Sequence, residues 1–69
     1  MKNQAQATEK QRRYIKKLAN EIRMDDNDLY ELAIVIQKEN GIYPVAAPDN
    51  WQFSAKAASK LIERLLKGA

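Results

Sequence analysis

The chain is 69 residues long, 45% of them hydrophobic, with a formal net charge of +3, 2 Gly, 2 Pro and neither Cys nor His. Without Cys there is no disulfide and no thiolate metal site; without His, the commonest metal ligand and the commonest acid or base near neutral pH are missing. This length allows one domain at most. No apolar run approaches the ~18–20 residues of a membrane span, and the first residues do not resemble a signal peptide, so we expect a cytoplasmic protein without a membrane partner.

Charge is distributed unevenly along the chain. Residues 1–24 carry seven basic and two acidic side chains, residues 25–50 carry one basic and six acidic, and residues 51–69 carry four basic and one acidic. Such segregation can steer a charged partner towards the protein. It can equally reflect complementary charges on helices that pack against each other, and the sequence leaves both interpretations open.

The N-terminal part is predicted to contain a tail and a first helix. Residues 1–7 are polar and aperiodic and are expected to be a disordered tail, ahead of a single domain over 8–69. Thr8 and Gln11 have the spacing of a capping box, which predicts a helix over 8–23. Its apolar face comprises Tyr14, Ile15, Leu18, Ala19 and Ile22. Basic residues occupy the opposite arc, so the solvent side of this helix is expected to be cationic.

A second helix is predicted over 26–40. Asp25 or Asp26 can cap its exposed N–H groups, Asp28 suits the positive helix end, and Gly41 favours a stop. Its apolar residues are Leu29, Leu32, Ala33 and Ile36, widened by Tyr30, Ile34 and Val35. Because they cover more than half of the girth, this helix is either central or has a second face that binds a partner.

Residues 41–53 are predicted to be irregular, because Pro44 and Pro48 exclude a continuous helix. The segment is apolar for a loop. It either folds back over the core, with Trp51 and Phe53 as plugs, or exposes aromatic anchors for a partner.

The last helix is predicted over 54–67, capped by Ser54 and ended by Gly68. These elements predict an all-α fold, a compact three-helix domain with an apolar irregular insert between the second and third helices. The expected core is Ile15, Leu18, Ile22, Leu29, Leu32, Ala33, Ile36, Ala58, Leu61, Ile62 and Leu65.

Several motifs resemble a known small helical module. They are Ala-Thr-Glu-Lys-Gln at 7–11, Tyr-Ile-Lys-Lys-Leu-Ala at 14–19, and Ser54 followed by Ala-Ser-Lys-Leu-Ile at 58–62. This pattern is similar to a module of phage, prophage and plasmid proteins, and distantly to the Mu-type GemA-like phage regulatory family. The resemblance covers about residues 7–36 and 53–67 and implies a mobile-element protein of a bacterial host cell, in a DNA-related or host-interacting context. The chain departs from the pattern at Arg23-Met24, where members often carry Gly, and in the longer, more hydrophobic segment 41–53.

Catalysis is not expected. The cluster Asp25, Asp26 and Asp28 lacks the Gly that a calcium loop needs at its bend, and helix capping explains it better. Ser54 and Ser59 have no base to activate them, and no glycine-rich phosphate loop occurs. We therefore expect a binding module without enzymatic activity, metal or cofactor.

Two kinds of partner are compatible with the sequence. Non-specific DNA binding would use two basic stripes: Lys10, Arg12, Arg13, Lys16, Lys17 and Arg23, and then Lys56, Lys60, Arg64 and Lys67. The alternative is docking on a host or phage protein, or homodimerisation, through apolar residues: Tyr30, Ile34, Val35, Tyr43, Trp51 and Phe53. Exposure of Trp51, Ile34 and Val35 is the feature that supports the second interpretation.

Overall fold

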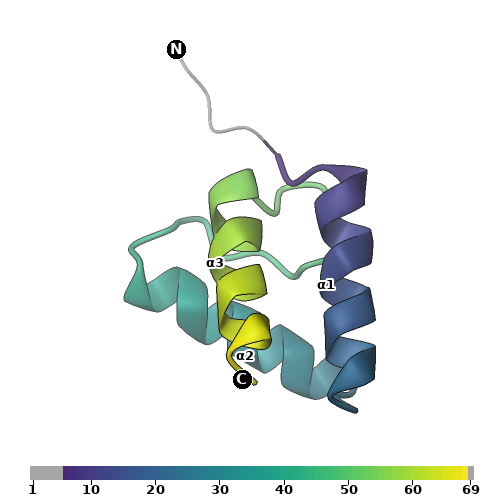
Figure 1. The fold of residues 1–69 in the computed structure, drawn as a ribbon. Coiled ribbons are helices and arrows are strands. Elements are labelled where there is room, and N and C mark those ends of the chain that lie inside the picture. Colours follow the sequence, from purple (N-terminus) through teal and green to yellow (C-terminus); the bar gives the residue numbers. More distant parts are fainter. Residues whose placement is uncertain (1–5, 69) are drawn as a thin grey trace.

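The computed structural model describes residues 6–68, which form three α-helices. Helix α1 spans Glu9–Glu21, α2 spans Asp26–Glu39 and α3 spans Ala55–Leu66 (Figure 1). This confirms the predicted all-α three-helix domain. Helices α1 and α3 are shorter than predicted at both ends and α2 at its C-terminal end only, because the residues beyond these limits act as caps. None of the helices in the described residues has the length and apolar character needed to traverse a lipid bilayer.

Side chains cap all three helix starts as the sequence predicts. Thr8 and Gln11 form a reciprocal capping box, with both hydrogen bonds at 3.0 Å. Asp25 accepts from the Asp28 N–H at 2.8 Å, and Ser54 accepts from the Ala57 N–H at 3.1 Å. Each cap satisfies a backbone donor that the first helical turn leaves free, which is typically worth about 1 kcal/mol.

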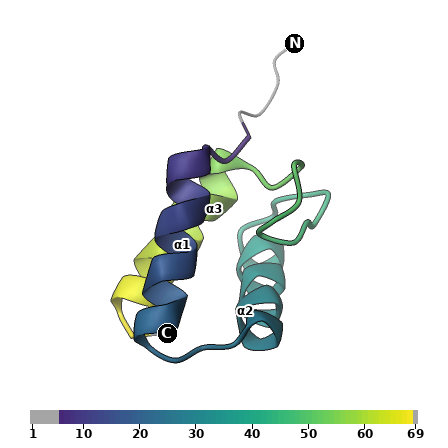
Figure 2. The same cartoon turned by 90° about the vertical axis from the view of Figure 1, so that its right-hand side faces the viewer.

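Helices α1 and α3 lie side by side and run in the same direction, and α2 packs across this pair (Figures 1 and 2). The parallel helices begin at the same end of the molecule. There the Ala7 N–H donates to the Phe53 carbonyl at 2.8 Å, and Gln6 forms an isolated antiparallel bridge with Ser54. The predicted tail 1–7 is therefore wrong for residues 6 and 7, which belong to the domain. Residues 1–5 of that predicted tail and Ala69 lie outside the described residues.

The buried core draws on all three helices and on their connections. Its apolar members are Ala7, Ile15, Leu18, Ala19, Leu29, Ala33, Ile36, Ile42, Ala46, Phe53, Ala57, Ala58, Leu61 and Leu65. Leu32 and Ile62 are only half-buried against this core. The prediction that Ile22 is a core residue is wrong, since its side chain is 39% exposed. Ile22 caps the C-terminal end of α1, so the regular helical spacing that predicted its burial stops one residue earlier.

Helices α1 and α2 end in the same backbone motif. The Met24 N–H donates to the Ala19 carbonyl and the Ile42 N–H to the Gln37 carbonyl, both at 2.8 Å. This is the Schellman arrangement, in which the residue after the C-cap adopts a left-handed conformation. Gly41 occupies that position after α2 with φ +66°, and Arg23 occupies it after α1 with φ +59°. Of these two residues only Arg23 has a Cβ, and the left-handed conformation disfavours residues with a Cβ.

Gln37 holds the connection between α2 and α3 against the core. This buried side chain donates through Nε2 to the carbonyls of Ala33, at 3.0 Å, and Ala46, at 2.7 Å. Its Oε1 accepts from the Ala46 N–H at 3.0 Å. Of the two interpretations left open for this segment, Phe53, with 0% exposure, follows the first and fills the core, whereas Trp51 is 65% exposed and does not plug it. The connection thus covers the core through some residues and presents others to solvent.

Candidate nucleic-acid interface

Helix α1 separates an apolar side from a cationic one. Its buried residues are Ile15, Leu18 and Ala19. Five basic side chains occupy the rest of its circumference: Lys10, Arg13, Lys16 and Lys17, which are exposed, and Arg12, which is half-buried. The amphipathic pattern of this segment is therefore realised in the fold, with a basic surface turned towards solvent.

Arg12 belongs to the fold as much as to the surface. Its Nη2 donates to the Asn50 carbonyl at 3.4 Å, which ties the turn before Trp51 to α1. Its Nε is buried and has no hydrogen-bond partner among the described residues. A substitution at Arg12 would thus disturb the packing of this turn, which makes it a poor probe of binding.

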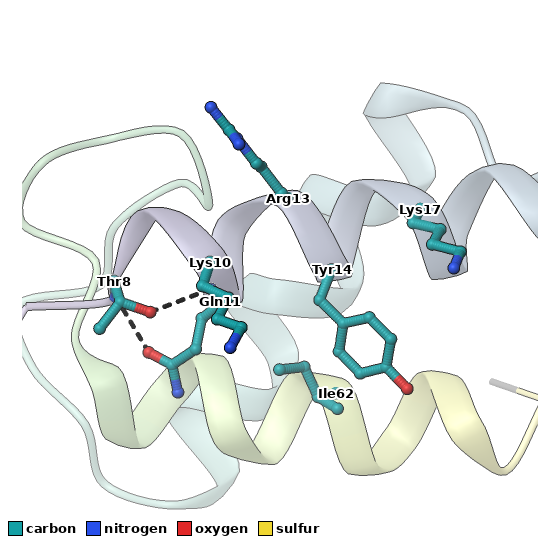
Figure 3. Close-up of a pocket in the computed structure, with 7 residues that line it drawn as sticks. All are labelled: Thr8, Lys10, Gln11, Arg13, Tyr14, Lys17 and Ile62. Carbon is teal, nitrogen blue, oxygen red and sulfur yellow. Dashed lines mark hydrogen bonds between the residues drawn. The ribbon is translucent and has the colours of Figure 1, made fainter.

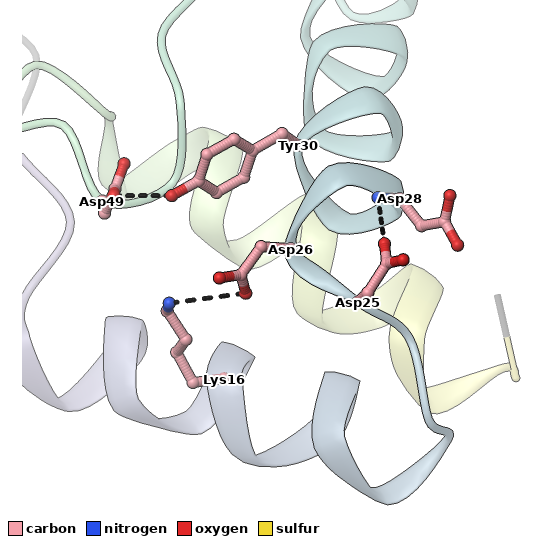
Figure 4. A network of polar contacts seen from close by, with 6 residues as sticks. All are labelled: Lys16, Asp25, Asp26, Asp28, Tyr30 and Asp49. Atoms are coloured by element: carbon pink, nitrogen blue, oxygen red, sulfur yellow. Dashed lines mark hydrogen bonds and ion pairs between the residues drawn. The ribbon is translucent and has the colours of Figure 1, made fainter.

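Two exposed ion pairs reduce the free positive charge of α1. Arg13 Nη2 lies 2.7 Å from Glu9 Oε2, one helical turn away. Lys16 Nζ lies 3.7 Å from Asp26 Oδ1 at the start of α2 (Figure 4). Exposed pairs of this kind are worth about 0–1 kcal/mol, so a phosphate can compete for either cation. Lys10 and Lys17 form no ion pair within residues 6–68.

Lys10 and Lys17 border a groove between α1 and α3. The groove, with a volume of about 540 Å³, is lined by Thr8, Lys10, Gln11, Arg13, Tyr14, Lys17 and Ile62. Tyr14 from α1 and Ile62 from α3 face each other across it, and Lys10 and Lys17 lie along α1 on either side of Tyr14 (Figure 3). The Arg13 guanidinium extends to the opposite side of α1 from Ile62 (Figure 3). The groove therefore combines an apolar floor with a cationic rim.

The second predicted basic stripe does not join this groove. Lys60, Arg64 and Lys67 instead line a smaller hollow beside the C-terminal end of α2, together with Glu39 and Asn40 among others. Lys56 and Arg23 are exposed and line neither hollow. The ten predicted cations thus divide between separate parts of the surface, and those of α1 form the more coherent group.

Tyr14 is the residue of this groove whose role the sequence did not reveal. Its position at helical spacing placed it on the apolar face, yet it is 40% exposed. It lies at the edge of that face, where the ring can cover apolar neighbours while its hydroxyl reaches water. A tyrosine flanked by lysines four residues before and three residues after was the available signal, since all three share one side of a helix.

The predicted apolar docking residues are mostly accessible. Ile34 and Val35 are exposed on α2, and Tyr43 and Trp51 are exposed on the connection to α3. The prediction that Phe53 is a docking residue is wrong, because its side chain is completely buried and cannot contact a partner. The Phe53 carbonyl accepts from the Ala7 N–H, and the next residue, Ser54, caps α3, so the chain turns inwards at this point.

Tyr30, the remaining docking candidate, is half-buried and engaged within the domain. Its hydroxyl donates to Asp49 Oδ2, which links α2 to the connection that follows it (Figure 4). This hydrogen bond, with burial and the nearby charges of Asp49 and Asp26, raises the pKa of Tyr30 from 10.0 to about 12. The ionised phenol would lose the bond and face a carboxylate, so the neutral form is favoured.

No family model, curated protein or solved structure matches this chain.

Proposed function

We propose that this chain is a non-catalytic module that binds nucleic acid, with little sequence specificity, through the cationic face of α1. The observation that supports the proposal is the groove between α1 and α3, where Lys10 and Lys17 flank the half-exposed Tyr14. Phosphates would be bound by these lysines and by Arg13, whose only ion pair in the described residues is a weak exposed one. A phage or mobile-element origin, which the sequence resemblance implies, is part of this proposal.

Low sequence specificity follows from the kind of groups on this face. Lysine ammonium groups bind phosphate as point charges, and contacts to phosphate carry no sequence information. The N-terminus of α2 carries Asp25, Asp26 and Asp28 and would be repelled by a phosphate backbone. This repulsion disfavours α2 as a recognition helix of the helix-turn-helix kind, whose N-terminus would enter the major groove.

The test is a fluorescence-anisotropy titration of labelled DNA with a charge-removal variant. Replacing Lys10, Arg13 and Lys17 together with Gln should weaken binding at least tenfold and leave the circular dichroism spectrum unchanged. The matched control replaces Lys60, Arg64 and Lys67 with Gln, which removes the same charge from the other hollow. Equal losses from both variants would show that only net charge matters, and no binding by the wild-type protein at low salt would refute the proposal.

Protein docking is the second candidate, supported by the exposure of Trp51, Ile34 and Val35. Exposed apolar residues on one helix and a neighbouring connection are typical of surfaces that contact another protein. Its simplest form, a homodimer through α2, can be tested by sedimentation velocity over a range of concentrations. Val35→Asp should abolish any self-association, and a wild-type chain that is monomeric throughout would remove this form of the proposal.

A further inference from the structure

The groove between α1 and α3 contains apolar side chains, which a phosphate-binding site does not need. Tyr14 is 40% exposed within it, and Ile62, which is half-buried, faces Tyr14 from α3 (Figure 3). A sugar–phosphate backbone presents charged oxygens and puckered sugars, and it has no flat apolar face to place against this floor. The ligand that fits must carry a flat apolar surface as well as negative charge.

From this combination we infer that the groove binds single-stranded nucleic acid in preference to duplex, with one unpaired base against Tyr14 and Ile62. This inference rests on the proposed nucleic-acid binding and specifies its substrate. In a duplex, the bases are paired and stacked, and extracting one costs a few kcal/mol. An unpaired strand offers its base faces without that cost, and aromatic side chains are the usual platforms on which they stack.

The positions of the cations match this mode of binding. Lys10 and Lys17 lie seven residues apart on one helix, about 10 Å along its axis, with Tyr14 between them. A base that enters the groove at Tyr14 therefore has an ammonium group on each side to receive the phosphates that flank its sugar. Because every base has an aromatic face, this arrangement favours no particular sequence.

The experiment compares three labelled ligands of equal length: an oligothymidine, a duplex, and an abasic strand with the same phosphates but no bases. Anisotropy titrations with the full chain should show the oligothymidine bound at least about fivefold more tightly than either of the others. If all three bind equally, the inference is wrong while the proposed function stands. If none binds, the proposed function itself is wrong.

Variants of Tyr14 distinguish stacking from a structural role. Tyr14→Leu keeps an apolar side chain opposite Ile62 and should lose the preference for the oligothymidine over the abasic strand. Tyr14→Phe keeps the aromatic face and should retain it. Val35→Leu, an exposed apolar change on α2, is the control and should leave the preference unaltered. A Tyr14→Leu protein that keeps the full preference would overturn the assignment of Tyr14.

Discussion

At the scale of single residues, two polar side chains of α2 attach the connection between α2 and α3 to that helix. Tyr30 hydrogen-bonds Asp49, and Gln37 forms three hydrogen bonds with backbone groups of Ala33 and Ala46. The first contact is at the surface and the second is buried, so their loss should have different consequences.

Tyr30 should ionise at an unusually high pH. Its pKa is raised to about 12 because the neutral phenol donates to Asp49. The contact therefore stabilises the fold fully below pH 10, the ordinary tyrosine pKa, and this contribution is lost as the pH rises from about 10 to about 12. In a spectrophotometric titration of phenolate absorbance, Tyr30→Phe should remove the step near pH 12, and Asp49→Asn should move it to lower pH. A step near pH 12 that persists in Tyr30→Phe would contradict the assignment.

Gln37 should be intolerant of an apolar replacement of similar size. Gln37→Leu would leave the buried N–H and C=O of Ala46 without their side-chain partner, and an unsatisfied buried group costs about 1–3 kcal/mol. Because two groups lose their partner, urea unfolding should show a loss of at least about 1–3 kcal/mol. Gln52→Leu, at an exposed position of the same connection, serves as the control and should change stability by less than about 0.5 kcal/mol. Equal stabilities of the two variants would show that Gln37 contributes nothing special.

At the scale of the elements, the Schellman motifs that end α1 and α2 differ in the residue at the left-handed position. Gly41 ends α2 without steric cost, while Arg23 ends α1 with the same left-handed backbone and a Cβ. Nothing in the described residues pairs with the Arg23 side chain to offset this conformation.

Arg23→Gly should therefore stabilise the protein. Relief of the left-handed conformation is worth about 1 kcal/mol, and part of it is cancelled by the greater freedom of Gly in the unfolded chain, which leaves about 0.5 kcal/mol. The measurement is the midpoint of urea unfolding. The control is Arg13→Gly within α1, which removes the same charge and should destabilise by about 0.5–1 kcal/mol. A destabilised Arg23→Gly protein would mean that the Arg23 side chain makes a stabilising contact.

At the scale of the whole molecule, charge is segregated by element. Helix α1 carries five basic and two acidic side chains, and α2 carries four acidic and one basic. A pair at 3.7 Å, Lys16 with Asp26, joins the two helices. Internal complementarity therefore uses part of the segregated charge, and the groove side of α1 remains cationic.

This distribution predicts a modest salt dependence of binding. With three phosphates neutralised by Lys10, Arg13 and Lys17, the logarithm of the single-strand affinity should fall with the logarithm of salt concentration with a slope of about −2. Replacing Lys10 and Lys17 with Gln should reduce the slope to about −0.7, since one contact remains. The measurement is a set of anisotropy titrations at several salt concentrations. An unchanged slope in the double variant would place the phosphates elsewhere.

Local signals in the sequence determined the helices and most of the core. Caps at Thr8, Asp25 and Ser54 act on their own first turns, and apolar spacing within a helix needs no knowledge of its neighbours. Such short-range physics is readable from the chain alone. The exposure of Ile22 was not, because it depends on where α1 stops.

Only the tertiary structure decided which surfaces exist. The parallel pairing of α1 with α3 creates the groove, turns Tyr14 into part of it, and separates the basic stripe of α3 from that of α1. The same packing buries Phe53 while leaving Trp51 exposed two residues earlier, although both are aromatic residues of one loop. A helix pattern specifies which side is apolar but not which neighbour covers it, and that depends on contacts between residues far apart in the chain. For this reason the sequence by itself determined the cationic face of α1, and the fold decided that an aromatic groove lies beside it.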